Sequence, residues 1–304
     1  MAQVATGNHC VTTPHRIDGD VTLVIPTLGR PILRRMLDAV RAGNTWPARI
    51  IIVDQGRKAD VAALADEHLA AGLDVLYLPS SSTGRSAGLN LGLERVETGF
   101  VVVTDDDCLV APDWIARLGE RLRRHPGAII TGRVEAGEGD AQLSVVTSTT
   151  EEIQHRPALR FDRLSGGNMG LPLEVARRVG PFTESPAMRT AEDGEFAYRA
   201  LRAGVSIVYA PEVVVTHLAW RDAAEREDQY YSYALSQGGF YGWYLRQGDA
   251  FIALRTIVHL LRASRRWLLG RLRGNADVAR NGRAYVLGLL PGLRAGWRSR
   301  GAAR

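Results

Sequence analysis

The first 110 residues alternate short apolar runs with segments of helical spacing, and this alternation is the feature that most restricts the fold. The runs are rich in Val, Ile and Leu and occupy residues 21–25, 50–53, 75–79 and 100–104. Between the first three runs, residues 31–40 and 61–69 repeat apolar side chains at helical intervals. Strands that alternate with helices are typical of a parallel, doubly wound sheet. We therefore expect an α/β fold with a mostly parallel central sheet flanked by helices.

Polar residues stand where the predicted strands end. Pro26 and Thr27 end the first run, Asp54 ends the second, and three consecutive aspartates, 105–107, follow the fourth. The carboxyl ends of strands in such a sheet face a common crevice, where ligands bind. A D-x-D spacing supplies the hard oxygen ligands that Mg²⁺ or Mn²⁺ prefers. The alternatives are a solvated acidic turn for the aspartate run and a capping or turn role for Asp54.

Length and composition describe a globular protein. The chain has 304 residues, 45% of them hydrophobic and 23% charged. Its first residues lack the basic start and apolar block of a secretory signal, and Arg interrupts each later apolar run. We expect a cytoplasmic protein without a transmembrane helix. Cys10 and Cys108 lack metal-site spacing, which argues against a structural zinc, and neither is a strong candidate nucleophile.

The second half is predicted to add further elements to the sheet. These are a strand at 129–134, an irregular polar region at 140–162, a helix at 173–179, a helix that begins at Glu192-Asp193, and two strands at 205–211 and 213–217. Acids at a helix start interact favourably with the helix dipole, or one of them projects into the crevice as a general base. His217 ends the last strand, where it is either a structural residue or a nitrogen ligand for a metal.

The C-terminal part carries the positive charge. Residues 250–304 contain 12 Arg and a single acid, Asp277, so they contribute +11 to the net charge of +5, and the remainder carries −6. Residues 251–273 form a predicted basic amphipathic helix, which either lies on an anionic membrane surface or docks its apolar face on the preceding domain with Arg outward. Seven aromatic residues between 230 and 244 either line an acceptor pocket or pack this region on the domain. No nucleic-acid recognition pattern is evident.

Taken together, these segments resemble the family-2 glycosyltransferases, inverting sugar transferases of the GT-A (Rossmann-like) fold. The resemblance covers roughly residues 20–220. It rests on the order of five segments: VTLVIPTLGR, IIVDQG, GRSAGLNLGL with VVVTDDDCLVAPDWI, SGGNMGLPLEVARRVGPF, and AEDGEFAYRALRAGVSIVYAPEVVVTH. We expect an N-terminal lead at 1–20, a GT-A catalytic domain at 21–220 and a C-terminal basic helical extension at 221–304.

The resemblance implies a role for individual residues. It assigns the donor nucleotide to Pro26, Thr27, Asp54, Arg85, Asp105 and Asp106. It assigns a Mg²⁺ or Mn²⁺ ion to Asp105, Asp107 and His217, with Asp107 as the direct ligand. It assigns the catalytic base to Asp193, and the region of donor sugar and acceptor to Gly167, Asn168 and Glu192. Leu89 replaces an Arg that many relatives have, so Arg85 alone carries the basic contact.

The expected function is a metal-dependent transfer of one sugar, with inversion, from a nucleotide-diphosphate donor to an acceptor hydroxyl. UDP is the expected nucleotide, with TDP and GDP as alternatives, and the acceptor is a natural product, a lipid-linked precursor or a polysaccharide precursor. The Q-x-x-R-W motif of processive synthases is absent after residue 220, which favours single transfers. The alternative functions are a sugar-nucleotide pyrophosphorylase and a non-catalytic carbohydrate-binding scaffold on the same fold.

Overall fold

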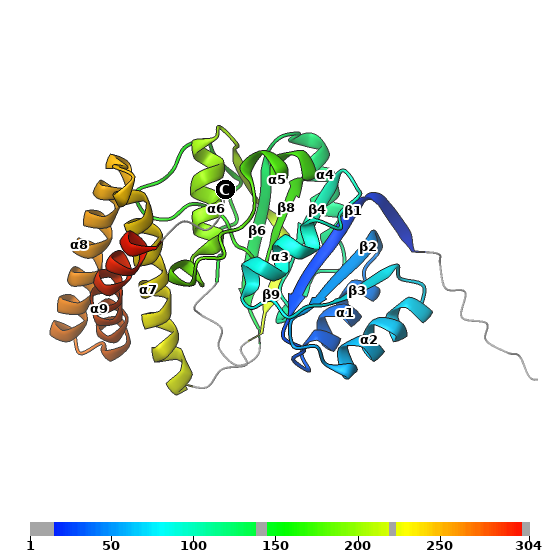
Figure 1. Ribbon diagram of the computed structural model, residues 1–304, viewed down its shortest axis with the longest axis horizontal. Coiled ribbons are helices and arrows are strands. Elements are labelled where there is room, and N and C mark those ends of the chain that lie inside the picture. Colours follow the sequence, from blue (N-terminus) through cyan, green and yellow to red (C-terminus); the bar gives the residue numbers. More distant parts are fainter. Residues whose placement is uncertain (1–14, 138–144, 219–222, 300–304) are drawn as a thin grey trace, which may run out of the picture.

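The computed structural model describes residues 15–137, 145–218 and 223–299, except for the side chains of 223–228. The first part of the predicted lead, with Cys10, lies outside the described residues. Within them, a mixed sheet of nine strands runs through the molecule with helices on both of its faces (Figure 1). Three long helices form a separate layer at one end of the molecule, with α7 nearest the sheet.

The strands are β1 (Arg16–Thr27), β2 (Thr45–Asp54), β3 (Val75–Pro79), β4 (Phe100–Val103), β5 (Cys108–Val110), β6 (Ile129–Ala136), β7 (Glu152–Gln154), β8 (Met169–Pro172) and β9 (Ile207–His217). The α-helices are α1 (Leu33–Arg41), α2 (Ala59–Ala70), α3 (Arg85–Leu93), α4 (Trp114–Arg124), α5 (Leu173–Val179), α6 (Glu192–Arg202), α7 (Ala223–Arg246), α8 (Ala250–Leu272) and α9 (Ala276–Arg298). A 3₁₀ turn, η2, spans Pro186–Met188.

The sheet order is β3-β2-β1-β4-β8-β6-β9-β5, with β7 paired to β9 outside this path. Strands β3, β2, β1 and β4 are parallel, as the alternation of strands and helices predicts. Strand β8 is antiparallel to both β4 and β6, and β5 is antiparallel to β9. The predicted mostly parallel α/β sheet is therefore confirmed.

Both faces of the sheet are buried, which explains why its strands read as continuous apolar runs. Leu23 and Ile25 of β1 pack with α1, α2 and α4, whereas Val24 points to the other face and packs with α3, α5 and α6. Residues Ile50 to Val53 of β2 alternate between the same two cores. The apolar runs of β1 and β2 leave no side chain exposed, and each of these strands ends in a polar residue, Thr27 or Asp54.

Two predicted boundaries are wrong. Strand β1 begins at Arg16, inside the predicted lead, because residues 16–18 pair with residues 45–47 of β2. The two strands predicted at 205–211 and 213–217 are one strand, β9. Its register against β6 shifts between Ala210 and Val214, so that Pro211, which has no N–H to donate, lies in the bulge.

The helical extension docks on the domain through aromatic side chains of α7. Phe240 and Tyr241 are fully buried in one cluster with Tyr198 of α6, so this part of the aromatic run packs in the core, and Phe240 also lines the large cleft described below. Tyr244 donates a hydrogen bond from its hydroxyl to Glu195 Oε1 at 2.7 Å. Helices α7 and α9 cross closely, because a Cβ on Gly292 would lie 2.1 Å from the carbonyl oxygen of Leu235. Glycine therefore sets the separation of these two helices.

The prediction that α8 packs its apolar face inward with Arg outward is right for most of its arginines and wrong for its large apolar side chains. The inner face of α8 carries Ile252, Thr256, His259 and Ala263, and Arg255 is 2% exposed and paired with Asp162 at 2.8 Å. Its outer face leaves five large apolar side chains between 49% and 73% exposed: Leu254, Ile257, Leu261, Leu268 and Leu272. Helices α8 and α9 approach closely, because a Cβ on Gly270 would lie 2.5 Å from the backbone nitrogen of Ala279.

Candidate active site

A cleft of about 1100 Å³ opens at the carboxyl ends of β1 and β4. Of the residues predicted to form the site, it is lined by Pro26, Thr27, Arg85, Asp105, Asp106, Asp107, Gly167, Glu192, Asp193 and His217. The acids at 105–107 and at 192–193, which are far apart in sequence, therefore share one cleft. Helices α7, α8 and α9 supply another wall, which includes Tyr230 and Tyr233 of the aromatic run.

Asp106, the middle aspartate, holds the loop after β1. Its Oδ2 accepts a hydrogen bond from Thr27 Oγ1 at 2.6 Å and another from Arg30 Nε at 3.3 Å. Burial raises the pKa of the Asp106 carboxyl, although the bonds from Arg30 and Thr27 oppose that rise. Arg30 also reaches Asp107, with Nη2 3.2 Å from Oδ2. Arg30 thus ties the aspartate run to β1.

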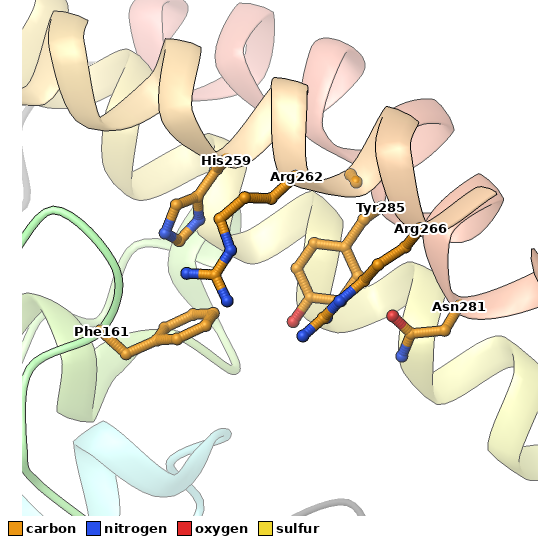
Figure 2. Close-up of a pocket in the computed structure, with 7 residues that line it drawn as sticks. Phe161, His259, Arg262, Arg266, Asn281 and Tyr285 are labelled. Atoms are coloured by element: carbon orange, nitrogen blue, oxygen red, sulfur yellow. The ribbon is translucent and has the colours of Figure 1, made fainter. Parts of the chain in front are cut away.

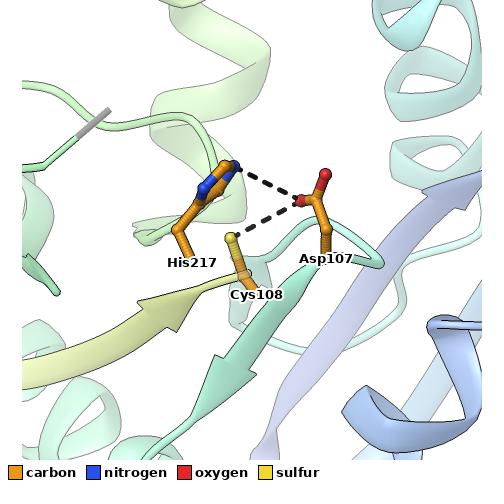
Figure 3. Close-up of side chains that lie close together, drawn as sticks. All are labelled: Asp107, Cys108 and His217. Carbon is orange, nitrogen blue, oxygen red and sulfur yellow. Dashed lines mark hydrogen bonds and ion pairs between the residues drawn. The ribbon is translucent and has the colours of Figure 1, made fainter. Parts of the chain in front are cut away.

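Asp107, Cys108 and His217 place their potential ligand atoms within 4.8 Å of one another. Strand β5 pairs with β9 so that Cys108 lies opposite His217, and the imidazole and thiol both face the Asp107 carboxylate (Figure 3). His217 Nε2 is 3.8 Å from Asp107 Oδ1, and His217 Nδ1 is buried without a hydrogen-bond partner. A carboxylate and an imidazole with an unused nitrogen fit a divalent cation.

Cys108 adds little to that site for a hard cation. Burial raises the pKa of its thiol well above the ordinary value, and the charges of Asp105 and Asp107 raise it further. The thiol therefore stays protonated, which also makes it a poor nucleophile, as expected from the sequence. Asp105 does not belong to this group of ligand atoms, because its carboxylate turns toward Arg85.

Arg85, at the start of α3, connects the two acidic segments. Its Nε donates to Asp105 Oδ1 at 2.6 Å, its Nη2 donates to the carbonyl of Gly166 at 2.8 Å, and its Nη1 lies 3.4 Å from Glu192 Oε1. Burial acts to lower the pKa of the guanidinium, but the charges of Asp105 and Glu192 outweigh it and raise that pKa. A Cβ on Gly167 would lie 2.9 Å from Asp105 Oδ2, so glycine here leaves room for the carboxylate.

Glu192 and Asp193 open α6 and differ in their surroundings. The pKa of Glu192 is raised to about 7 by burial and by the charge of Asp193, while Arg85 opposes the rise. Its Oε2 is buried without a partner. Burial also raises the pKa of Asp193, whose carboxylate accepts backbone N–H bonds from Gly194 at 2.7 Å and Gly166 at 3.3 Å. These bonds hold the Asp193 carboxylate in one orientation in the cleft wall.

Two predicted site residues lie behind the cleft surface. Asp54 is fully buried and accepts hydrogen bonds from the backbone N–H groups of residues 56, 57 and 58 and from the Tyr77 hydroxyl. This is the turn role that the sequence left open, and Gln55 lines the cleft in its place. Asn168 is also fully buried and bonds to the Trp114 indole and to backbone carbonyls of β6 and β9. Its amide joins strands rather than facing a ligand.

Sequence reasoning missed Arg30, Cys108 as a neighbour of the metal ligands, and the cleft wall formed by α8 and α9. Arg30 follows the polar end of β1 directly, which is a signal that could have found it. The other two depend on strand pairing and helix docking, which no local pattern predicts.

The sheet order and the acidic cleft at its carboxyl edge are those of the GT-A class of α/β proteins. The family model described as "Glycosyltransferase like family 2" matches residues 18–231, which is more than half of the chain. The chain therefore belongs to glycosyltransferase family 2.

Several known proteins are similar to this chain in sequence or in fold, at sequence identities of 12% to 22%. The O-antigen chain rhamnosyltransferase RfbN of Salmonella typhimurium is 22% identical over 211 residues, which cover 65% of this chain and 66% of that protein. The mannosyltransferase PcManGT of Pyrobaculum calidifontis, solved with GDP-Man and Mn²⁺, superposes with a TM-score of 0.62 at 16% identity and covers 91% of this chain and 85% of that one. The S. aureus TarS 1–349 complex with UDP-GlcNAc has a TM-score of 0.55, 12% identity and coverage of 88% and 92%. The chain spans from 17% to 66% of the length of the curated relatives that it matches.

Proposed function

We propose that this protein transfers one sugar, with inversion, from a nucleoside-diphosphate sugar to an acceptor hydroxyl, and that the transfer requires Mg²⁺ or Mn²⁺. The observation that carries the proposal is the convergence of two groups in one cleft. Asp107 and His217 lie at one wall, and Asp193 lies at another. A leaving diphosphate needs a cation and an attacking hydroxyl needs a base, and these residues are suited to supply both.

The proposal agrees with what the relatives contain. PcManGT was solved with GDP-Man and Mn²⁺, and TarS was solved with UDP-GlcNAc. We propose a UDP-sugar as donor, with TDP and GDP as alternatives. The name of RfbN describes a sugar transferase of O-antigen chains. We propose a glycan or lipid-linked precursor, or a natural product, as acceptor.

In this mechanism, Asp107 and His217 would hold the divalent cation, which when bound neutralises charge on the departing diphosphate. Asp105 is the neighbour of the donor ribose or sugar. Arg85, which Asp105 and Glu192 hold in place, adds a fixed positive charge near the phosphates. Thr27 and Asp106 keep the loop after β1 in the conformation that leaves Pro26 on the cleft surface.

Asp193 is the proposed base. Its carboxylate, oriented by the N–H groups of Gly166 and Gly194, accepts the proton of the acceptor hydroxyl as that oxygen attacks the anomeric carbon. The acceptor attacks the face opposite the diphosphate, so the anomeric configuration inverts. Glu192 lies 3.4 Å from Arg85 through Oε1, and its unpartnered Oε2 is the proposed contact to the sugar or acceptor. No nucleophilic side chain of the protein is required.

A screen of donors tests this function. In thermal unfolding experiments, we expect one class among UDP-, TDP- and GDP-sugars to raise the melting temperature by a few degrees in the presence of Mn²⁺, because the ligand binds only the folded state. Without Mn²⁺, the same sugar should raise the melting temperature much less. We also expect slow Mn²⁺-dependent release of the nucleoside diphosphate. Absence of both effects for every donor would favour a binding scaffold. Formation of pyrophosphate from a nucleoside triphosphate and a sugar phosphate would identify a pyrophosphorylase instead.

We also propose that the outer face of α8 binds an anionic membrane surface. The five exposed apolar side chains described above are accompanied by exposed arginines at 265 and 271 of α8 and by Arg273 directly after it. Apolar side chains beside basic ones suit the boundary between acyl chains and anionic headgroups, where each cation contributes about 1 kcal/mol. Among the described residues, no helix has both the length and the apolar character needed to cross a membrane. The proposed contact is therefore parallel to the surface.

Co-sedimentation with vesicles tests the membrane contact. We expect binding to phosphatidylglycerol-containing vesicles at low salt, weaker binding at high salt, and little binding to phosphatidylcholine alone. Replacement of Leu261 and Leu268 by glutamine should remove the binding without changing the melting temperature, because both side chains are exposed. A failure to sediment at low salt would contradict the proposal. So would a dimer in solution that the same two substitutions dissociate, since a second copy would then cover this face.

A further inference from the structure

A basic pocket lies where α8 and α9 form the wall of the cleft. Arg262 and Arg266 project from α8 toward Tyr285 of α9 and the ring of Phe161, and Asn281 stands beside them (Figure 2). Arg266, Asn281, Tyr285 and Phe161 also line the large cleft that contains Asp193. The pocket therefore opens into the candidate active site from a wall that carries no metal ligand.

The positive charge of this pocket has no counter-charge within the described residues. No carboxylate lines the pocket, and Asp162, which follows Phe161, is paired with Arg255. One guanidinium nitrogen of Arg262, Nη1, is buried without a hydrogen-bond partner. Burial lowers the pKa of Arg262, and the charges of Arg160 and Arg266 lower it further. Arg262 is half-buried and Arg266 is exposed, so both guanidinium groups can reach a ligand in the cleft, and the unpartnered Nη1 of Arg262 can donate to an anion.

The other groups of the pocket suggest what carries the anion. Asn281 Oδ1 is buried without a partner, and an amide oxygen accepts hydrogen bonds, so it is suited to a hydroxyl. Phe161 is 49% exposed and offers an apolar ring beside the arginines. Guanidinium groups, a hydroxyl acceptor and an aromatic ring together suit a sugar or polyol that bears a phosphate or carboxylate.

We propose that this pocket binds the anionic group of the acceptor, a phosphate or carboxylate attached to a sugar or polyol unit. The inference rests on the proposed function and specifies its acceptor. With the anionic group held by Arg262 and Arg266, the rest of the acceptor lies along the cleft toward Asp193. The donor diphosphate belongs to the wall formed by Asp107 and His217, so the two phosphate-binding regions are distinct.

Binding of inorganic phosphate tests the pocket without any donor. In EDTA and at constant ionic strength, we expect millimolar phosphate to raise the melting temperature of the wild type by about 2 °C relative to chloride. The Arg262→Gln/Arg266→Gln variant should lose this shift. Arg265→Gln, which removes an exposed arginine of the same helix, should keep it. Asn281→Asp should also lose the shift, because it places a negative charge in the pocket.

The Asp107→Ala variant separates the two phosphate-binding regions, and we expect it to keep the phosphate shift. A shift that disappears in Asp107→Ala and persists in Arg262→Gln/Arg266→Gln would overturn the proposal, because phosphate would then occupy the donor region. An equal shift in the wild type and in the double variant would overturn it as well.

Acceptor kinetics supply the second test. The acceptors are aryl glycosides with and without a 6-phosphate, and the measured quantity is the ratio of their kcat/KM values. We expect the wild type to favour the phosphorylated acceptor. The double variant should lose about 10- to 100-fold of that preference, because charged hydrogen bonds to the phosphate are removed. Donor hydrolysis by water should not change. An unchanged preference, or a raised KM for the donor, would overturn the proposal. If the wild type releases no nucleotide from any donor, the proposed function fails, whereas the phosphate experiment still tests the pocket.

Discussion

The Asp193→Asn variant is expected to lose sugar transfer by roughly 10²- to 10⁴-fold in kcat, the contribution typical of a general base. Asparagine keeps the shape of the side chain and can still accept the N–H bond of Gly194. Affinity for the nucleotide sugar should therefore change little. The measurement is steady-state transfer together with calorimetric titration of the donor in Mn²⁺. The Asp60→Asn variant, which changes an exposed aspartate of α2, is a matched control.

The pH profile gives an independent check on the base. Asp193 acts in its ionised form, and burial raises its pKa above the ordinary 3.8. Transfer should therefore be present at high pH and be lost as the pH falls through that raised value. Glu192, with a pKa of about 7, titrates together with Asp193, so the acid limb belongs to the pair. Full activity of Asp193→Asn, or an acid limb that persists unchanged in it, would exclude Asp193 as the base.

Replacement of Asp107 by alanine should lower the Mn²⁺-dependent affinity for the nucleotide sugar by at least roughly tenfold, because even the loss of a group that only supports a metal ligand costs that much. Without Mn²⁺, the variant and the wild type should bind the nucleotide similarly. His217→Ala should also lower the Mn²⁺-dependent affinity, since the His217 imidazole of the wild type faces the Asp107 carboxylate. Calorimetric titration of the nucleotide with and without Mn²⁺ measures both.

Cys108→Ala is the control for the metal prediction. Its thiol lies 3.9 Å from Asp107 Oδ1, yet burial keeps it protonated, so Mn²⁺-dependent affinity should stay within about twofold of the wild type. Loss of metal affinity in Cys108→Ala would point to a softer ion than Mn²⁺. Unchanged affinity in both Asp107→Ala and His217→Ala would show that these residues do not hold the cation.

The roles of individual polar residues at strand ends differ more than their positions suggest. Asp54 ends a buried strand and Asp107 follows one, but four donors of the chain satisfy Asp54, whereas Asp107 lies beside His217, whose Nδ1 has no partner. Asn168 lies next to Gly167 in sequence, yet only Gly167 faces the cleft. A donor contact by Asp54 stays a prediction, and any such contact would have to replace bonds that hold its own loop.

The amino-acid sequence by itself determined the parallel part of the sheet, the position of its acidic edge and the start of α6, whereas the short strands β5, β7 and β8 were missed. Each of the determined features follows from local patterns: apolar runs of strand length, helical spacing, and polar residues where the chain leaves the core. Only the tertiary structure decided which side chains meet. The pairing of β5 with β9 puts Cys108 opposite His217, Arg85 joins Asp105 to Glu192, and α8 turns Arg262 and Arg266 toward the cleft while its leucines face outward. The physical reason is that these contacts join segments that are distant along the chain. Strand register and the close packing of helices at glycines determine which residues come into contact. The spacing of residues along one segment predicts neither of them.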